Sequence, residues 1–464
     1  MTLRPSLLLA PLCALAPAAR VQEGVTQERV QSAFVEVRAA VESALAFAPA
    51  ALELRFVEPA AVAERITAEN LPMVRLRQSD PAKAEAEARS LGFALSQFAF
   101  AKYAWSTHEL LVVTDRWEEQ AEQLGRPEMC DDATLRAVLV HELMHARDDA
   151  EHGIASLLLH ASTSDAAVAA NALLEGHAQF EARRVCARAG WSAGFDTYTT
   201  AIGALPESAG ELDEVSRTML RVQSATIAAA YNQGERFVAA LFEAGGAELV
   251  ARAFREPPAD GDTIFHPEWY LDPTKRPRVL YDAEPALDLV AARYPEETWS
   301  SQRASLQQAQ VEAALALLPT ETVANVVRTL RAARVIVQKP QVAPDSKMVV
   351  VALMEFEDEA AARAYLDAAR HLGELKAERM KTGSLRITDR RRTELDRPAC
   401  SGYLERLHLK VGPTDVEVVA LDAARGPLVA ECVFSGEPIE DEALAAFAGE
   451  LLDAARPIAA PAPR

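Results

Sequence analysis

Hydrophobic residues recur every three or four positions along most of the first 255 residues, which is typical of amphipathic helices that pack on one face. This spacing predicts helices over residues 25–48, 81–102, 132–150, 164–189 and 211–255. The fourth should stop at Gly190, because glycine commonly ends helices. The fifth should be interrupted near Gly234 and at Gly245 and Gly246. Two short apolar runs, 51–57 and 109–114, predict strands.

The pattern of apolar residues changes in the second half of the chain. A proline-rich stretch over 256–287 predicts a loop and a domain border, and residues 301–335 have a helical pattern. The elements expected after it are a buried strand over 348–354, a helix over 358–379, strands over 403–411, 416–421 and 428–434, and a helix over 441–455. This order is typical of an α+β domain with a mostly antiparallel sheet.

The expected fold is therefore α+β, in two domains. A mostly helical domain with a small sheet should span residues 20–290, and a smaller α+β domain should follow over 291–464. The length of 464 residues is ample for two hydrophobic cores. The second domain contains no catalytic motif, so its role is left open.

The first residues have the pattern of a secretory signal peptide. Arg4 precedes a short apolar run over 6–15, and Ala16-Pro17-Ala18 is typical of a cleavage site. Residues 1–19 should therefore be removed when the protein is exported to the periplasm or the medium. The alternative is a buried N-terminal helix. Beyond residue 20 every stretch long enough to cross a bilayer carries charge, so no transmembrane segment is expected.

The charge of the chain narrows the choice of partners. Lys and Arg total 48 against 68 Asp and Glu, which gives a net charge of −20 at pH 7. An acidic chain without a basic cluster repels phosphate backbones, so nucleic acid is not an expected partner.

The strongest chemical signal is the pentapeptide His141-Glu142-Leu143-Met144-His145, an HExxH motif inside the predicted helix 132–150. Two histidines at i and i+4 share one face of a helix, so both imidazoles can reach one metal ion. Glu142 projects beside that ion and is placed to take a proton from a water whose pKa zinc lowers to about 7. The alternative is a helix with two incidental surface histidines.

A catalytic zinc ion needs three protein ligands and one open position. Glu175 lies in the next long predicted helix, over 164–189, and is the candidate third ligand. Gly176 beside it would let another helix approach closely. His177 and Glu181 are competing ligands, and Glu175 could instead be one of many solvated carboxylates. The sequence thus predicts one Zn²⁺ held by His141, His145 and Glu175.

The segments HELMHARDD and LLEGHA resemble those of the gluzincin zinc metallopeptidases, the group that includes thermolysin and the aminopeptidase-N-like enzymes. Leu174 stands where the aminopeptidase-like members carry Asn. The resemblance implies a zincin-type catalytic domain and hydrolysis of a peptide or protein substrate, with Glu142 as general base. It also implies that the strand over 109–114 is an edge strand that pairs with an extended substrate.

The resemblance assigns further roles by position. Asp149 would orient a ligand histidine, with Asp148 or a solvated helix end as alternatives, and Gln179 could accept a hydrogen bond from a ligand. Two later segments, YNQGERFV and FHPEWYL, are similar to those of exported bacterial members of the group. Gluzincins stabilise the oxyanion with a Tyr or His, and the candidates here are Tyr231, His266 and Tyr270. Tyr231 could instead be a core aromatic, and His266 could cap a turn.

Four cysteines lie beyond the predicted signal peptide, an even number that is compatible with two disulfides. The number of residues from Cys130 to His141 equals the number from Glu175 to Cys186. This predicts a Cys130–Cys186 disulfide if the two helices run antiparallel; unpaired buried thiols are the alternative. Cys400 and Cys432 could form a second bridge.

The GWSAG segment over 190–194 fits a nucleophile elbow, but a helix rather than a strand is expected before it.

The function that these features favour is an exported zinc-dependent peptidase. Two alternatives belong to other classes: a zinc-binding scaffold that has lost turnover, and a zinc hydrolase of a non-peptide substrate. The sequence does not distinguish endopeptidase from exopeptidase action.

Overall fold

The computed structural model describes residues 24–48, 52–78, 80–96, 99–161, 163–202, 204, 214–295, 298–341, 347–380, 385–397, 400–411, 414–436 and 439–458. The predicted signal peptide, residues 1–19, lies outside them. The chain divides into two compact units. The N-terminal unit contains the described part of residues 9–210 and 223–275, and the C-terminal unit contains the described part of 276–464 together with the start of one long helix, up to Val222.

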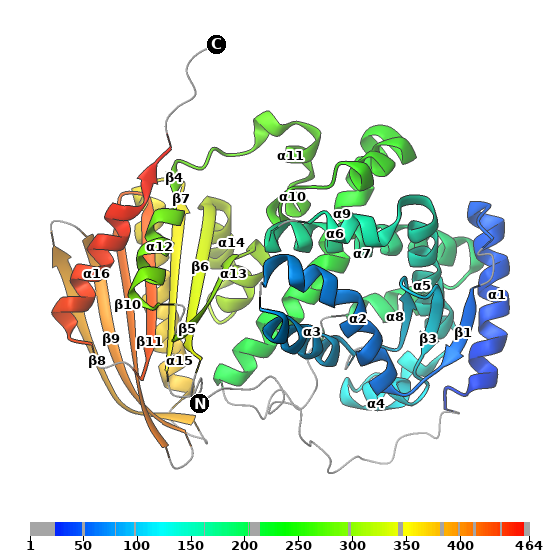
Figure 1. The fold of residues 1–464 in the computed structure, drawn as a ribbon, viewed down its shortest axis with the longest axis horizontal. Coiled ribbons are helices and arrows are strands. Elements are labelled where there is room, and N and C mark those ends of the chain that lie inside the picture. The colour runs from blue at the N-terminus through cyan, green and yellow to red at the C-terminus, as the bar shows by residue number, and fades with distance from the viewer. Residues whose placement is uncertain are drawn as a thin grey trace. The chain divides into compact units, whose positions relative to one another are not determined.

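The N-terminal unit is mostly helical and carries one small sheet (Figure 1). Its helices are α1 (Gln27–Leu45), α2 (Pro59–Arg77), α3 (Pro81–Ser96), α4 (Asp115–Gln123), α5 (Asp132–His152), α6 (Ile154–Leu159), α7 (Ser164–Ala189), α8 (Ser192–Ala201), α9 (Glu214–Arg255), α10 (Gly261–Phe265) and α11 (Pro267–Leu271), with 3-10 turns η2 (Pro127–Cys130) and η4 (Pro273–Lys275). Its strands are β1 (Glu53–Phe56), β2 (Ala101–Ala104) and β3 (Glu109–Val112).

Helix α5 is the centre of this unit. Every residue from Ala137 to Ala146 is buried, because α1, α7, α8 and β2 pack around it. The hydrophobic core around α5 includes the fully buried Trp117 and Phe195, together with apolar residues of α1 and the sheet. None of the described helices is long and apolar enough to span a membrane.

The helix ends follow the capping signals of the sequence. The Thr163 side chain accepts a hydrogen bond from the Ala166 N–H at the start of α7, and Gly190 ends it with a φ of 80°. The predicted stop at Gly190 is confirmed, and a helix precedes GWSAG, so that segment is not a strand-to-helix nucleophile elbow. The predicted interruption of α9 at Gly234 is wrong: the helix continues and departs from helical geometry at Gly245 and Gly246.

The three-stranded sheet has the order β1-β3-β2, so β3 is the central strand. The expectation that residues 109–114 form the substrate-pairing edge is therefore wrong, because β1 and β2 occupy both sides of β3. The helix predicted over 81–102 ends at Ser96, and the chain then enters β2.

The C-terminal unit is an α+β domain. Its strands are β4 (Tyr281–Asp282), β5 (Trp299–Ser305), β6 (Leu330–Pro340), β7 (Met348–Phe356), β8 (Leu385–Arg397), β9 (Cys400–Val411), β10 (Thr414–Arg425), β11 (Leu428–Ser435) and β12 (Arg456–Pro457). Its helices are α12 (Glu284–Arg293), α13 (Gln308–Ala314), α14 (Thr320–Thr329), α15 (Glu359–Arg379) and α16 (Asp441–Ala454). Seven strands form an antiparallel sheet in the order β5-β6-β7-β11-β10-β9-β8.

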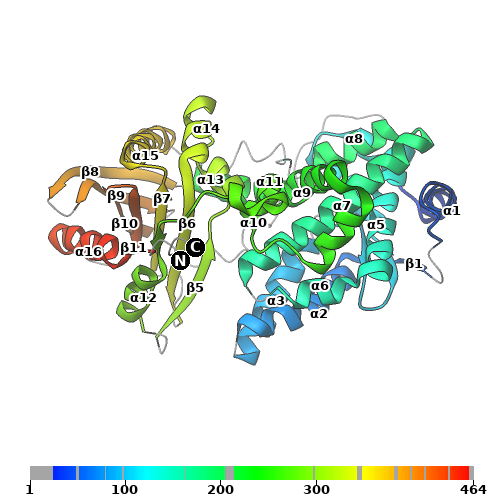
Figure 2. The ribbon, with the colours of Figure 1, turned by 90° about the horizontal axis from the view of Figure 1, so that it is seen from above.

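Helices cover both faces of this sheet. Figure 2 shows α12 and α16 on one face and α15 with α13 and α14 on the other. The apolar side chains of each face form a separate cluster with the helices that cover it. The antiparallel sheet and the helices near 358–379 and 441–455 are as predicted.

Three strands of the large sheet differ from the sequence expectation. Residues 301–335 are not continuously helical, because β5 and β6 lie at their two ends, and β8 was not expected at all. Strand β8 is rich in charge, and Arg390 and Arg392 pair there with Glu405 of β9. The C-terminal unit also begins earlier than residue 291, because α12 packs with α16 in the same core.

Candidate metal centre

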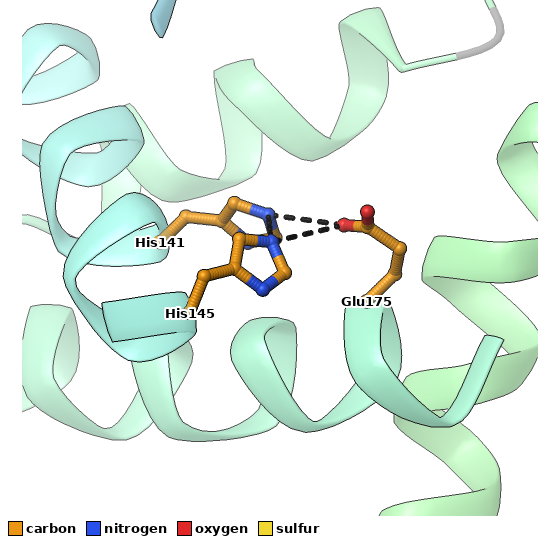
Figure 3. A group of neighbouring side chains, drawn as sticks. All are labelled: His141, His145 and Glu175. Carbon is orange, nitrogen blue, oxygen red and sulfur yellow. Dashed lines mark hydrogen bonds and ion pairs between the residues drawn. The ribbon is translucent and has the colours of Figure 1, made fainter. Parts of the chain in front are cut away.

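Two buried helices bring the predicted metal ligands together. His141 and His145 project from α5, and Glu175 projects from α7 toward the Nε2 atoms of both rings (Figure 3). The two Nε2 atoms are 3.1 Å apart, and Glu175 Oε2 lies 3.2 Å from that of His141 and 3.3 Å from that of His145. Among the described residues, no other group of three or more ligating side chains lies this close together.

The spacing of these three atoms fits the ligands of a tetrahedral zinc ion. Bonds of about 2.0–2.2 Å from zinc to nitrogen or oxygen place neighbouring ligand atoms about 3.3 Å apart. Hydrogen bonding alone does not explain the triangle, because each Nε2 carries at most one hydrogen and the carboxylate none, so at least one of its three sides is not a hydrogen bond. The Nδ1 atoms of both rings are buried without a hydrogen-bond partner among the described residues. The atoms that converge on one centre are the two Nε2 atoms and the Glu175 carboxylate oxygen.

The protein groups alone already favour a positive charge at this centre. Burial would lower the pKa of His145, but the Glu175 carboxylate outweighs it and raises that pKa to about 9. Burial would likewise raise the pKa of Glu175, yet His145 and His141 hold it well below its usual range. A divalent cation bound here would take the place of the proton on His145.

Close helix contacts at glycines set the position of α9 against α7. A Cβ atom on Gly176 would lie 2.0 Å from the carbonyl carbon of Gly234, and one on Gly234 would lie 2.1 Å from the Ala172 oxygen. Any larger residue would force the helices apart, as expected from the sequence for Gly176. Tyr231 lies one turn before Gly234 on α9, so this contact brings its ring to the ligand cluster.

Two tyrosines flank His141. The ring of Tyr231 stacks on the imidazole at 5.5 Å between centroids, and the ring of Tyr198 meets it edge-on at 5.7 Å. Burial, reinforced by nearby carboxylates such as Glu175, raises the pKa of both phenols well above the usual value. Both hydroxyls therefore keep their protons at neutral pH and can donate hydrogen bonds.

Sequence reasoning missed Tyr198. It lies on α8 one turn after Gly194, where a Cβ atom would meet the Ala133 carbonyl carbon at 2.1 Å. The glycine lets α8 approach the start of α5, as Gly234 lets α9 approach α7. A glycine followed four residues later by a tyrosine, on a short helix after the third ligand, was the available signal.

Glu142 is buried beside the ligands and faces the small sheet. Its Oε2 accepts a hydrogen bond of 2.5 Å from the backbone N–H of Tyr103 on β2. This is the only hydrogen bond of the carboxylate to another described residue, so Oε1 remains available to a water or substrate. Tyr103 was not expected from the sequence, because the helix predicted over 81–102 covers the first half of β2 and no strand was predicted there.

The structure does not join every candidate to the centre. His266 is partly exposed, pairs with Glu268 and stacks on Trp269, and Tyr270 donates its hydroxyl to the Glu256 carbonyl. Their described contacts thus lie outside the ligand cluster. Tyr231 is the one oxyanion candidate that contacts a ligand ring.

The acids and amide near the second histidine also differ from expectation. Asp149 accepts hydrogen bonds from the Tyr103 hydroxyl and the Ile154 N–H rather than from a ligand imidazole. Asp148 pairs with His177 Nδ1 at 2.7 Å, and that pairing keeps His177 out of the ligand group. Gln179 is buried, and its amide has no partner among the described residues.

The predicted disulfides are not present. Cys130, Cys186, Cys400 and Cys432 are free and buried, although Cys130 and Cys186 lie in the same hydrophobic cluster. Burial raises the pKa of the Cys186 thiol to about 12. Cys400 and Cys432 belong to β9 and β11, which β10 separates. Two strand spacings amount to about 10 Å, which is too far for a disulfide.

No protein-family model matches the sequence of this chain, and no curated protein matches it. The function must therefore be inferred from the site itself.

Proposed function

We infer that the chain is an exported zinc-dependent peptidase whose ion is held by His141, His145 and Glu175. The observation that supports this most strongly is the triangle of two imidazole nitrogens and one carboxylate oxygen, 3.1–3.3 Å apart. Two histidines, one glutamate and an open fourth position are a donor set of catalytic zinc. On this proposal the N-terminal unit is a zincin-type domain of the gluzincin kind.

Zinc bound there would acidify a water molecule and polarise the scissile carbonyl. Glu142 follows His141 directly on α5, and its free oxygen can accept a proton from that water. The same carboxyl group then carries the proton to the leaving amine. Tyr231 keeps its proton and can donate a hydrogen bond to the developing oxyanion.

Cleavage of a fluorogenic peptide library tests the proposal. The wild type should cleave, 1,10-phenanthroline should abolish cleavage, and added zinc should restore it. Glu142→Gln should lose about a thousandfold in kcat while keeping its zinc. Glu151→Gln is the matched control, because this α5 carboxylate pairs with Arg147 on the surface.

The other outcomes separate the alternatives. Bound zinc without cleavage would favour an inactive scaffold. Cleavage that resists both the chelator and the Glu142→Gln substitution would contradict the proposal.

A further inference from the structure

The β2–β3 hairpin contacts the general base through its backbone. The Phe100 carbonyl accepts from the Val113 N–H, and the antiparallel register pairs Tyr103 with Leu110. Opposite residues of an antiparallel pair alternate between positions that exchange hydrogen bonds and positions that do not. Phe100 exchanges a hydrogen bond with β3, and Tyr103 is three residues later, so the Tyr103 N–H points away from β3. It points to Glu142, whose Oε2 lies 2.5 Å away.

The Tyr103 side chain makes a second contact with α5. The Tyr103 hydroxyl donates to Asp149 Oδ2 at 2.8 Å, and His108 Nδ1 lies 2.9 Å from that hydroxyl and 3.1 Å from Asp149. Asp149 follows Glu142 by about two turns along the helix. Tyr103 therefore bridges these turns of α5, with its N–H at one end and its hydroxyl at the other.

His108 reaches this cluster at a conformational cost. It has a φ of 54°, in the left-handed region, which a residue other than glycine rarely adopts. Its side chain is 73% exposed, so apolar packing does not explain the strain. The loop over 105–108, in which the Thr107 N–H bonds to the Ala104 carbonyl, turns the chain through this conformation, and the contacts with Tyr103 and Asp149 hold the side chain there.

We propose that Tyr103, held by Asp149 and His108, is the positioning residue of Glu142. The backbone N–H fixes one carboxylate oxygen, so that the other faces the ligand cluster. The phenol anchored on Asp149 fixes the place of that N–H. Asp149 thus acts on the general base through β2 rather than on a metal ligand. The effect on catalysis rests on the proposed function. The anchor, by which we mean the hydrogen bonds of Tyr103 to Glu142 and Asp149, does not.

Residue-resolved hydrogen–deuterium exchange of the full-length chain tests the anchor without any activity. The Tyr103 amide should exchange slowly in the wild type. Glu142→Ala removes the acceptor and should speed its exchange by about tenfold or more, whereas Glu142→Gln keeps a carbonyl acceptor and should preserve most of the protection. Equal exchange in the wild type and Glu142→Ala would overturn the proposal.

Variants of the phenol cluster test the second step. Tyr103→Phe and Asp149→Ala, which remove the donor and the acceptor of the second contact, should each speed exchange at the Tyr103 amide several-fold. In a peptide-cleavage assay they should lower kcat by about ten- to a hundredfold, with KM and zinc content unchanged. A purely structural role would instead lower zinc content or raise KM. Unchanged exchange and kcat in both variants would overturn this step.

Tyr365→Phe is the matched control. It removes a phenol–carboxylate hydrogen bond of 2.6 Å, to Glu431 in the C-terminal unit, and should change neither Tyr103 exchange nor kcat. If the wild type cleaves no peptide, the proposed function fails. The exchange results on Glu142 and Tyr103 then still support or overturn the anchor.

Discussion

Both units of the protein bury a cluster of charged groups, and the two clusters are built differently. In the N-terminal unit, His141, His145 and Glu175 direct three donor atoms at one point. In the C-terminal unit, Asp422 and Glu431 face each other across β10 and β11, and Glu405 lies on the neighbouring strand β9. Asp422 and Glu405 are buried, and Glu431 is bonded to a buried tyrosine.

Two of the three C-terminal acids have a polar or charged partner, whereas the buried Oδ1 of Asp422 accepts no hydrogen bond from a described residue. Glu431 accepts the Tyr365 hydroxyl, and Glu405 pairs with Arg390 and Arg392. Burial, followed by the neighbouring Glu431, raises the pKa of Asp422 to about 8, so its carboxyl is mostly protonated at neutral pH. This cluster needs no cation. Buried charge alone therefore does not mark a metal site; convergence of donor atoms on one point does.

The largest effect on zinc affinity should come from removing the Glu175 carboxylate. Glu175→Ala should weaken zinc binding by on the order of a hundredfold or more and abolish cleavage, because a lost ligand costs more than a lost outer contact. Competition with a zinc chelator measures it. His177→Ala, two residues along α7, should keep the affinity, and Asp422→Asn should also leave it unchanged. Loss of zinc in His177→Ala alone would assign the third ligand to that residue.

Glycines of the two units should respond in opposite ways to alanine. Gly234→Ala places a Cβ atom 2.1 Å from the Ala172 oxygen, so α9 must move away from α7 at a cost of about 1–3 kcal/mol. Gly373→Ala in α15 meets nothing closer than 3.4 Å and should be neutral or stabilising by up to about 1 kcal/mol. Hydrogen exchange in peptides of α7, α9 and α15 measures both. Equal protection of α7 and α9 in Gly234→Ala and the wild type would contradict the close contact.

Zinc affinity should depend on pH through His145. Because its pKa is about 9 before metal binding, zinc must displace one proton at neutral pH. The affinity should fall by about tenfold per unit as the pH is lowered from 8 to 6, after correction for protonation of the competing chelator. A flat profile over this range would show that no proton is displaced.

The smallest expected effect concerns Asp422. Its folded-state pKa of about 8 lies above the unfolded value near 4, so the native state holds the proton more tightly. This group therefore stabilises the C-terminal unit fully below about pH 4 and loses that contribution as the pH rises to about 8. Asp422→Asn should remove this slope, as measured by exchange in β10 and β11 peptides after correction for intrinsic rates. An unchanged slope would contradict the shifted pKa.

Local sequence patterns predicted the metal ligands, but they did not predict features that depend on packing between residues far apart in the chain. The i and i+4 histidines share a face in any helix, and Gly190 ends its helix through local geometry, so the sequence sufficed for them. Tyr198 reaches His141 only because Gly194 lets α8 approach α5. Pairing of β2 with β3, and the ion pairs that bury charge beside β8, likewise depend on residues far apart in the chain.

The central claim is that two imidazoles and one carboxylate share a single zinc ion. X-ray absorption at the zinc edge of full-length Glu142→Gln protein, loaded with one equivalent and dialysed, tests this most directly. We predict one retained zinc ion per chain, four-coordinate, with two histidines and oxygen ligands at about 2.0–2.2 Å. Loss of zinc on dialysis, or a spectrum without histidine scattering, would contradict the account.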